Sequence, residues 1–279
     1  MTRLAIPIGI SSFRKVREEE YFYIDKTIFI EKFLSKKPAE VTLFTRPCRF
    51  GKSLTLSMLK EFLDINGDCL TLFNNLYIVE NKNICSKWMN KHPVILLNLK
   101  DVRGKSFSTL YSLCANIMMD ICSEHMYLLD SQKVLESDKI RLQKIIRGSM
   151  EDGLLERSLY ILCRALSTHW GEQAILLIDE YDVPFAVAEE YGYYPDLAEF
   201  MRVFLSSALK ENTYLQFAVM TGCLRIARER IFTGLNNVLC DSVSDNRFAE
   251  CFGFTDKEVE SLLVSAGMAH TFGGGPGLV

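Results

Sequence analysis

The sequence is poor in the features that mark membrane-spanning, secreted and repetitive proteins. Among 279 residues there are only 7 prolines and 16 glycines, which excludes collagen-like and low-complexity chains. Long apolar runs are missing: Val94–Leu97 and Ala174–Ile178 are far shorter than the roughly 20 residues of a membrane-spanning helix. The apolar N-terminal stretch is followed by no small-residue cleavage site, so we expect no secretory signal peptide. We expect a cytoplasmic protein without a membrane partner.

Metal-binding and disulfide patterns are missing as well. The nine cysteines are an odd number and include no CxxC pair. The four histidines, His92, His125, His169 and His270, share no motif with each other or with the cysteines. We therefore expect reduced thiols and no structural zinc.

The net charge of −3 is unevenly distributed. Residues 1–60 carry twelve Lys and Arg against six Asp and Glu, a net charge of +6, which leaves −9 for the remaining 219 residues. A local basic region in an acidic protein suits a phosphate-bearing ligand better than a nucleic-acid duplex, which favours a broad basic face. Ordinary fluctuation of charge along a chain explains the same numbers equally well.

Short apolar strands alternate with amphipathic helices along the chain. Strands of this kind are predicted at Val41–Thr45, Val94–Leu99, Ala174–Asp179 and Tyr214–Met220, and the stretches between them carry apolar residues at helical spacing. Strands without polar alternation, separated by such helices, are typical of a parallel sheet covered on both faces. The sequence thus predicts the α/β class. We interpret the charged residues 130–150 as a helical excursion or a surface insertion.

A phosphate-binding loop is predicted after the first strand. Thr45–Ser53 match the second half of the pattern GxxxxGK[ST], in which backbone N–H groups wrap phosphates, Lys reaches the β and γ oxygens and Ser holds Mg²⁺. Arg46 replaces the first glycine, so Pro47 is expected to stiffen the turn and Arg46 or Arg49 to add charge. An ordinary turn with a solvated lysine is the alternative. The residues expected to bind nucleotide are Arg46, Pro47, Cys48, Arg49, Phe50, Gly51, Lys52, Ser53 and Leu54.

Two carboxylates follow the buried strand Ala174–Ile178. In a Walker B arrangement the first carboxylate, here Asp179, holds Mg²⁺ together with Ser53. The second, here Glu180, orients and deprotonates the attacking water, with Asp182 as the next candidate for that base. Ligands of open α/β sheets bind at this edge. Two exposed carboxylates where a strand meets a loop are the alternative interpretation.

The order of these motifs suits ATPases better than GTPases. The interval from Ser53 to Asp179 holds the additional strand Val94–Leu99, an ordering that suits P-loop ATPases with a catalytic Glu and an extra strand between the two Walker strands. Guanine-selecting proteins usually carry Asn-Lys-x-Asp, whereas the Asn-Lys pairs at Asn81 and Asn90 have Ile84 and Pro93 in the fourth place. Adenine is therefore the expected base.

A polar residue at the end of the strand beside Walker B can sense the γ-phosphate. Thr221 occupies that place and joins Lys52 and Glu180 as a predicted catalytic residue. The following arginines either stabilise charge in the transition state or belong to a basic, solvent-facing helix. These arginines are Arg225, Arg228 and Arg230.

Six blocks occur in order along nearly the whole chain, to about residue 267. They are Ile8–Phe13 with Tyr23–Thr27, Arg46–Ser53, Leu177–Asp182, Thr221-Gly222, Ile231–Asn237 and Phe252–Thr255. Together they resemble the bacterial AAA-ATPase-like family. Its loop typically reads Arg-Pro-Arg-Arg-Phe-Gly-Lys-Ser, so Arg46 in the glycine place is a trait of that family, while Cys48 replaces a usual arginine.

The resemblance implies a P-loop NTPase three-layer sandwich over residues 1–254 and the start of a truncated helical lid, with a Gly-rich tail, over residues 255–279. Family members often continue into a domain similar to PD-(D/E)xK nucleases, and no nuclease residues are present here, so this chain does not support a nucleic-acid partner. A capping box of Thr255 and Glu258 predicts a short helix that ends near Gly267.

The expected function is that of a Mg²⁺-dependent ATPase acting as a switch or motor, with ATP and Mg²⁺ as cofactors. An ATP-binding interaction module with little or no hydrolysis is the alternative, and a nuclease would need a region that this chain lacks. Because ATPases of this branch often complete the site with a cation from a neighbour, a homo-oligomer or a protein partner is also considered. Without a lid we expect the chain to bind ATP better than it turns ATP over.

Overall fold

Five parallel strands form the sheet at the centre of the molecule. The computed structural model describes residues 5–149, 153–223 and 237–265. The strands stand in the order β2-β3-β4-β1-β5. Their bounds are β1 Val41–Thr45, β2 Val94–Asn98, β3 Ala174–Asp179, β4 Leu215–Gly222 and β5 Val238–Asp241. The parallel sheet confirms the predicted α/β class.

Both faces of the central strands are buried, which explains their continuous apolar sequence. In β3, Ile175 and Leu177 belong to one hydrophobic core, while Leu176 and Ile178 belong to the other. Successive side chains of a strand point to opposite faces, so a strand covered on both sides has no polar alternation. The sheet therefore separates two cores.

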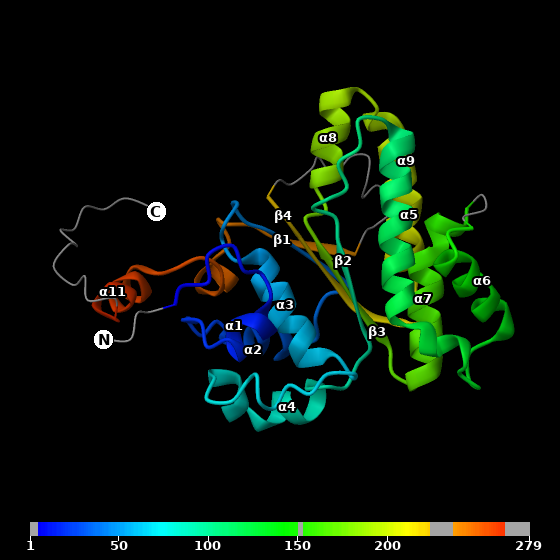
Figure 1. Cartoon of the computed structure of the whole chain (residues 1–279). Coiled ribbons are helices and arrows are strands. Elements are labelled where there is room, and N and C mark those ends of the chain that lie inside the picture. Colours follow the sequence, from blue (N-terminus) through cyan, green and yellow to red (C-terminus); the bar gives the residue numbers. More distant parts are fainter. Residues whose placement is uncertain (1–4, 150–152, 224–236, 266–279) are drawn as a thin grey trace.

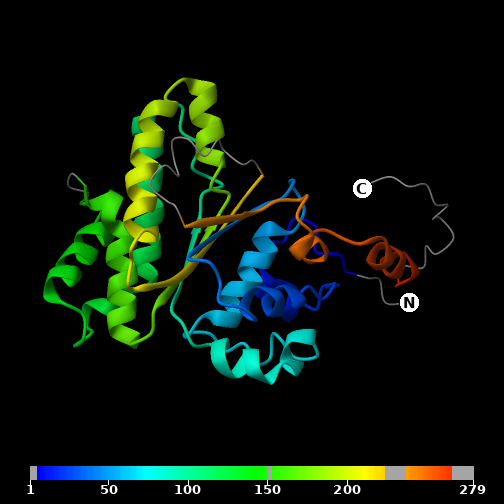
Figure 2. The same ribbon diagram turned by 180° about the vertical axis from the view of Figure 1, so that it is seen from behind.

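Helices cover each face and complete a three-layer sandwich (Figure 1). One layer contains α1 Phe13–Glu18, α2 Ile28–Leu34, α3 Lys52–Leu63 and α4 Lys82–Trp88, with the short η1 Tyr77–Glu80 and η3 Asn246–Cys251. The other contains α5 Phe107–Glu124, α6 Glu136–Ile146, α7 Leu154–Trp170, α8 Val183–Tyr191 and α9 Tyr194–Leu209, with the short η2 Met126–Leu129. Figure 2 shows the same arrangement from behind.

β1 precedes the predicted phosphate loop and β3 ends in the two carboxylates, and the strand that lies between them in the sheet comes late in the chain. In the sheet, β4 lies between β1 and β3, whereas β2, the run that separates the motifs along the chain, lies at an edge. The additional strand predicted at Val94–Leu99 is present as β2 in the expected interval of the chain, and in the sheet it is β4 that separates β1 from β3. Parallel neighbours need a crossover connection, so sequence order and sheet order differ freely in such folds.

The segments at the margins of the fold also take definite structure. Residues 130–150 contain α6, so the helical interpretation of this segment is correct. The capping box forms as predicted: Thr255 N donates to Glu258 at 2.7 Å, and Glu258 N donates to Thr255 Oγ1 at 3.4 Å. The helix that it opens, α11 Asp256–Ser265, has no buried residue. The predicted C′ residue, Gly267, and the Gly-rich tail lie outside the described residues.

Among the described helices, none combines the length and the apolar character that crossing a bilayer requires.

Candidate functional site

The candidate site lies where the carboxyl ends of the strands meet. The register pairs Thr45 at the end of β1 with Gly222 at the end of β4, and Asn98 at the end of β2 with Asp179 at the end of β3. The loop before α3 starts at this edge, because β1 ends at Thr45 and α3 begins at Lys52. The sheet thus gathers the two predicted motifs on one edge, as parallel sheets do with their ligand sites.

The loop turns sharply at two positions. Arg49 has φ 69° and Gly51 has φ 78°, both in the left-handed region. Gly51 is the residue just before the first turn of α3, where no side-chain cap satisfies the helix N–H groups. Free N–H groups and the positive end of the helix dipole make such a terminus favourable for an anion.

The ammonium group of Lys52 is held inside the loop. Its Nζ donates to the carbonyl oxygens of Arg46 and Pro47, each at 3.0 Å, and to Cys223 Sγ at 3.2 Å. These three partners match the three donors of an ammonium group. The residue is only 6 % exposed, so the predicted alternative of a solvated lysine is wrong. Lys52 therefore links the loop to the end of β4.

The side chain of Arg46 has a structural role. Its Nη2 lies 2.5 Å from Asp241 Oδ1 at the end of β5, and its Nη1 donates to the carbonyl oxygens of Asp241 and Thr45. The guanidinium also lies 4.8 Å from the ring centre of Phe252, and the residue is 2 % exposed. Burial raises the pKa of Asp241, while Arg46 opposes that rise. The expectation that Arg46 adds charge for phosphate is therefore not supported by its side-chain contacts, which join β1 to β5.

Asp179 is buried between two polar neighbours. Thr221 Oγ1 donates to its Oδ1, and Asn98 Nδ2 donates to its Oδ2 at 3.3 Å. Thr221 thus lies beside the predicted metal ligand, at the end of the strand next to β3, as the sequence suggested. Each carboxylate oxygen keeps lone pairs beyond the one that accepts this hydrogen bond. The arrangement fixes the carboxylate in one orientation.

Glu180 combines a left-handed backbone conformation with a raised pKa. Its φ of 54° is in the left-handed region, which costs a residue with a side chain free energy and is common at active sites. Burial and the neighbouring charge of Asp179 raise the pKa of Glu180, whereas Lys52 and Arg103 oppose the rise. The charges of Lys52 and Asp179 therefore both act on Glu180, so the structure brings the two motifs together.

The turn after β3 packs tightly against β4. Asp182 Oδ2 accepts from Cys223 N at 2.9 Å, and Tyr181 N donates to the carbonyl oxygen of Thr221 at 3.1 Å. A Cβ at Gly222 would lie 2.6 Å from the Tyr181 ring and 2.7 Å from Asp182 Oδ1, closer than side-chain contacts allow. Gly222 is therefore required for this close approach, which explains the Thr-Gly pair in the sequence.

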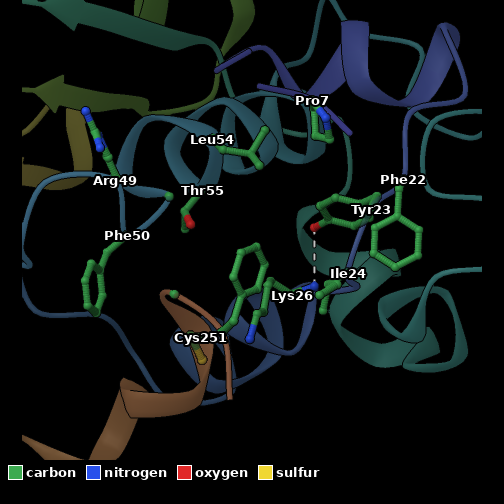
Figure 3. A pocket seen from close by; sticks show the side chains of 13 residues that line it. Pro7, Phe22, Tyr23, Ile24, Lys26, Arg49, Phe50, Leu54, Thr55 and Cys251 are labelled. Atoms are coloured by element: carbon green, nitrogen blue, oxygen red, sulfur yellow. Dashed lines mark hydrogen bonds between the residues drawn. The ribbon is translucent and has the colours of Figure 1, made fainter. Parts of the chain in front are cut away.

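A small apolar cavity of about 120 Å³ adjoins the loop. Figure 3 shows Phe22, Tyr23 and Ile24 on one side of it and Leu54 and Thr55 of α3 on the other. Its remaining lining comes from Pro7, Lys26, Arg49, Phe50, Gly51, Cys251, Gly253 and Phe254. The lining is thus mostly apolar and comes from three segments that are far apart in the sequence.

The segment after η3 is attached to the same loop. Gly253 N donates to the carbonyl oxygen of Phe50 at 3.0 Å, and a Cβ at Gly253 would lie 3.0 Å from the Phe50 ring. Gly253 has φ 67° as well, so both its conformation and its contact favour glycine. Lys26 Nζ contacts Glu258 at 2.7 Å and thereby links the N-terminal segment to α11.

The remaining predicted residues lie on the loop, at the start of α3 or outside the described residues. Ser53 and Leu54 lie in the first turn of α3 and are half-buried, and Pro47, Cys48 and Arg49 are exposed on the loop. Sequence reasoning missed Asn98, although its place after the apolar run of β2 could have revealed it. The arginines Arg225, Arg228 and Arg230 lie outside the described residues.

The comparison with known proteins fits this geometry. Residues 7–232 match the family AAA-ATPase_like, described as "Predicted AAA-ATPase". The chain belongs to this AAA-ATPase-like family. The match includes the loop, the acidic end of β3 and Thr221, which are the parts of the site described above. The resemblance drawn from the six sequence blocks is thereby confirmed.

A similar protein of Azotobacter chroococcum mcd 1 carries no assigned activity. It is described as an "Uncharacterized protein in vnfD 5'region" and is 26 % identical over 276 residues, which cover 94 % of this chain. The same match covers 45 % of the relative, so this AAA-ATPase-like chain spans less than half of the relative's length.

Proposed function

We propose that this AAA-ATPase-like chain binds ATP with Mg²⁺ at the carboxyl edge of the sheet and hydrolyses it. The observation that carries the proposal is the position of Lys52, whose ammonium group connects the phosphate loop to β4 and whose charge acts on Glu180. Phosphate oxygens would replace the loop carbonyls as partners of this ammonium group. The backbone N–H groups at the start of α3 would then face the same phosphates.

The residues at this edge suit a magnesium ion. Magnesium in nucleotide sites is held by one or two protein oxygens together with phosphates and waters. Ser53 offers a hydroxyl at the start of α3, and Asp179 offers a carboxylate held in place by Thr221 and Asn98. The ion would neutralise charge on the phosphates. Among the described residues, no group of three or more His, Cys, Asp and Glu side chains is placed to hold a metal ion.

Glu180 is the proposed general base. A carboxylate that deprotonates water works best when its pKa is raised toward the working pH, and burial together with Asp179 shifts Glu180 in that direction. Lys52, the first residue of α3, acts on Glu180 through its charge, and Thr221 at the end of β4 donates to the neighbouring Asp179.

The apolar cavity beside the loop is the proposed binding site of the adenine base of ATP. Nucleobases bind in mostly apolar pockets with a few polar groups that set their orientation. The cavity borders Gly51 and Thr55, so a nucleotide with its phosphates on the loop would direct its base and ribose toward Tyr23 and Phe254.

Titration calorimetry with Mg·ATP tests the proposal. We expect Lys52→Ala to weaken binding about 10- to 100-fold, since hydrogen bonds to charged groups contribute roughly 1.5–3 kcal/mol each. Lys60→Ala, which removes a lysine from the same helix, is the matched control and should bind as the unmodified chain does. Equal affinity of the Lys52→Ala variant would contradict the proposal. Binding without phosphate release would instead indicate an interaction module.

A further inference from the structure

Two cysteine side chains lie next to each other, one on the predicted phosphate loop and one just after β4. Cys48 lies on the loop and Cys223 follows β4, 175 residues later, yet their sulfur atoms are 3.1 Å apart. Cys48 is exposed and Cys223 is half-buried. A disulfide needs about 2.05 Å between the sulfurs, so a shift of about 1 Å within a turn would bring the pair to bonding distance.

The other cysteines differ from this pair. Five of them are buried, and burial raises the pKa of the Cys114, Cys122 and Cys163 thiols to about 12, which keeps them unreactive at neutral pH. Cys85 and Cys240 are half-buried, and within the described part of the chain neither forms a hydrogen bond with another sulfur atom. Cys48 and Cys223 therefore combine access to solvent with a neighbouring thiol.

We propose that Cys48 and Cys223 form a reversible disulfide that closes the nucleotide site. The effect on nucleotide rests on the proposed function, whereas the crosslink itself does not. Because Lys52 donates to Cys223 Sγ, the crosslink would form directly beside the ammonium group that is proposed to bind phosphate.

The oxidant would be a low-molecular-weight disulfide. The Cys48 thiolate attacks one sulfur of that disulfide, its bond breaks, and one small thiolate leaves while a mixed disulfide forms on Cys48. The Cys223 thiol loses its proton and attacks the Cys48 sulfur, which releases the second small thiolate. The two cysteines together lose two protons and two electrons, and the small disulfide is reduced to two thiols. Excess small thiol reverses both steps.

The order of attack follows from the surroundings of the two thiols. Burial and the hydrogen bond with Cys48 raise the pKa of the Cys223 thiol, and Lys52 only partly opposes this. The exposed Cys48 is the thiol that a small disulfide can reach first. Cys223 then acts as the resolving thiol, since Lys52 stabilises its thiolate when the proton leaves.

The crosslink would prevent the loop from wrapping phosphates. Cys48 lies between Pro47, whose carbonyl accepts from Lys52, and Arg49, whose φ is positive, so fixing its side chain to β4 fixes the turn itself. Phosphate binding requires the loop N–H groups to converge on one anion. We expect Mg·ATP to bind at least about tenfold more weakly to the oxidised chain.

Oxidised glutathione is the probe for the crosslink. After treatment of the full chain, non-reducing tryptic digestion should yield residues 37–49 linked to residues 211–225, because trypsin does not cut before Pro38 or Pro47. The linked pair should disappear with excess dithiothreitol, and it should be missing in Cys48→Ser and Cys223→Ser. Cys240→Ser, the matched control, should still form it. Absence of linked peptides in the unmodified chain overturns the proposal.

Calorimetry with Mg·ATP on the same samples tests whether the disulfide weakens nucleotide binding. Oxidation should weaken binding in the unmodified chain and in Cys240→Ser, and dithiothreitol should restore it. In Cys48→Ser the affinity before and after oxidant should be equal. If the chain with the Cys48–Cys223 disulfide binds Mg·ATP as tightly as the reduced chain does, the proposal that the disulfide closes the nucleotide site is overturned. If the reduced chain does not bind Mg·ATP, the proposed function fails, while the peptide map still decides whether the crosslink forms.

Discussion

At the carboxyl edge of the sheet, three residues are held in defined positions or conformations by their surroundings. Lys52 has three acceptors within 3.2 Å, and both carboxylate oxygens of Asp179 accept hydrogen bonds. Glu180 combines a left-handed backbone with a raised pKa. A residue that is held in an unfavourable conformation beside two charged groups is a strong candidate for chemistry.

We expect Glu180→Gln to bind Mg·ATP as the unmodified chain does and to release no phosphate above background. The amide resembles the carboxylate in size but cannot accept the proton of water. In the unmodified chain the active form is the deprotonated carboxylate, so turnover should fall as pH drops through the raised pKa of Glu180. This fall should occur at a higher pH than it would for a glutamate with an ordinary pKa. Phosphate release at saturating nucleotide, measured against pH, checks both points. Loss of activity in Asp182→Asn with normal activity in Glu180→Gln would reassign the base.

Sequence reasoning predicted the residues whose chemistry follows from a motif and missed those that depend on sheet register. Lys52, Asp179 and Thr221 were predicted because each stands at a fixed place relative to a strand end. The contact between Asn98 and Asp179 arises because β2 and β3 pair side by side, which the chain order alone does not reveal. The contact between Cys48 and Cys223 depends in the same way on the pairing of β1 with β4.

At the scale of elements, the loop that precedes α3 is attached at both ends. Arg46 connects its start to the end of β5 through Asp241, and Gly253 holds its other end through the carbonyl oxygen of Phe50. These attachments hold the two ends of the loop against β5 and against the segment after η3. The residue in the glycine place thus contributes to the shape of the loop.

We expect Arg46→Gly to destabilise the protein, although it restores the glycine of the common pattern. The substitution leaves Asp241 buried without its cation, and removing one partner of a buried pair costs about 3–5 kcal/mol. Urea unfolding should show a lower midpoint. Arg46→Gly combined with Asp241→Asn should recover part of the loss, whereas Arg17→Gly, at an arginine outside the site, should lower the midpoint less. An unchanged midpoint in Arg46→Gly would show that the pair is not needed.

The strands and most helices could be predicted because their apolar periodicity is strong. Apolar residues at helical spacing, Leu155, Leu159, Leu162 and Leu166 in α7 and Leu197, Met201 and Leu205 in α9, are all buried. The position of β4 between β1 and β3 could not be derived from periodicity, because every crossover order buries the same stripes. The pairing of Arg46 with Asp241 was hidden for a related reason, since β5 is only four residues long.

At the scale of the whole molecule, the candidate base cavity joins parts that are distant in the sequence. Its lining comes from the N-terminal segment, from α3 and its loop, and from the segment between η3 and α11. Lys26 contacts both the carbonyl oxygen of Glu250 and the carboxylate of Glu258, so it connects the first and last of these. A ligand in this cavity would contact all three segments at once.

Binding of a nucleotide across these segments should therefore raise the unfolding temperature of the whole chain. A ligand that binds only the folded state at 100 times its Kd adds about 2.7 kcal/mol to the free energy of unfolding. For a domain of this size each kcal/mol raises the Tm by roughly 2–4 °C, so we expect a rise on the order of 5–10 °C with Mg·ATP. Scanning calorimetry measures it. Lys52→Ala should lose most of this rise at the same nucleotide concentration, and GTP should give less of it because the chain lacks the Asn-Lys-x-Asp that selects guanine. An equal rise with inorganic triphosphate would show that the cavity takes no part, since that anion carries the phosphates without the base.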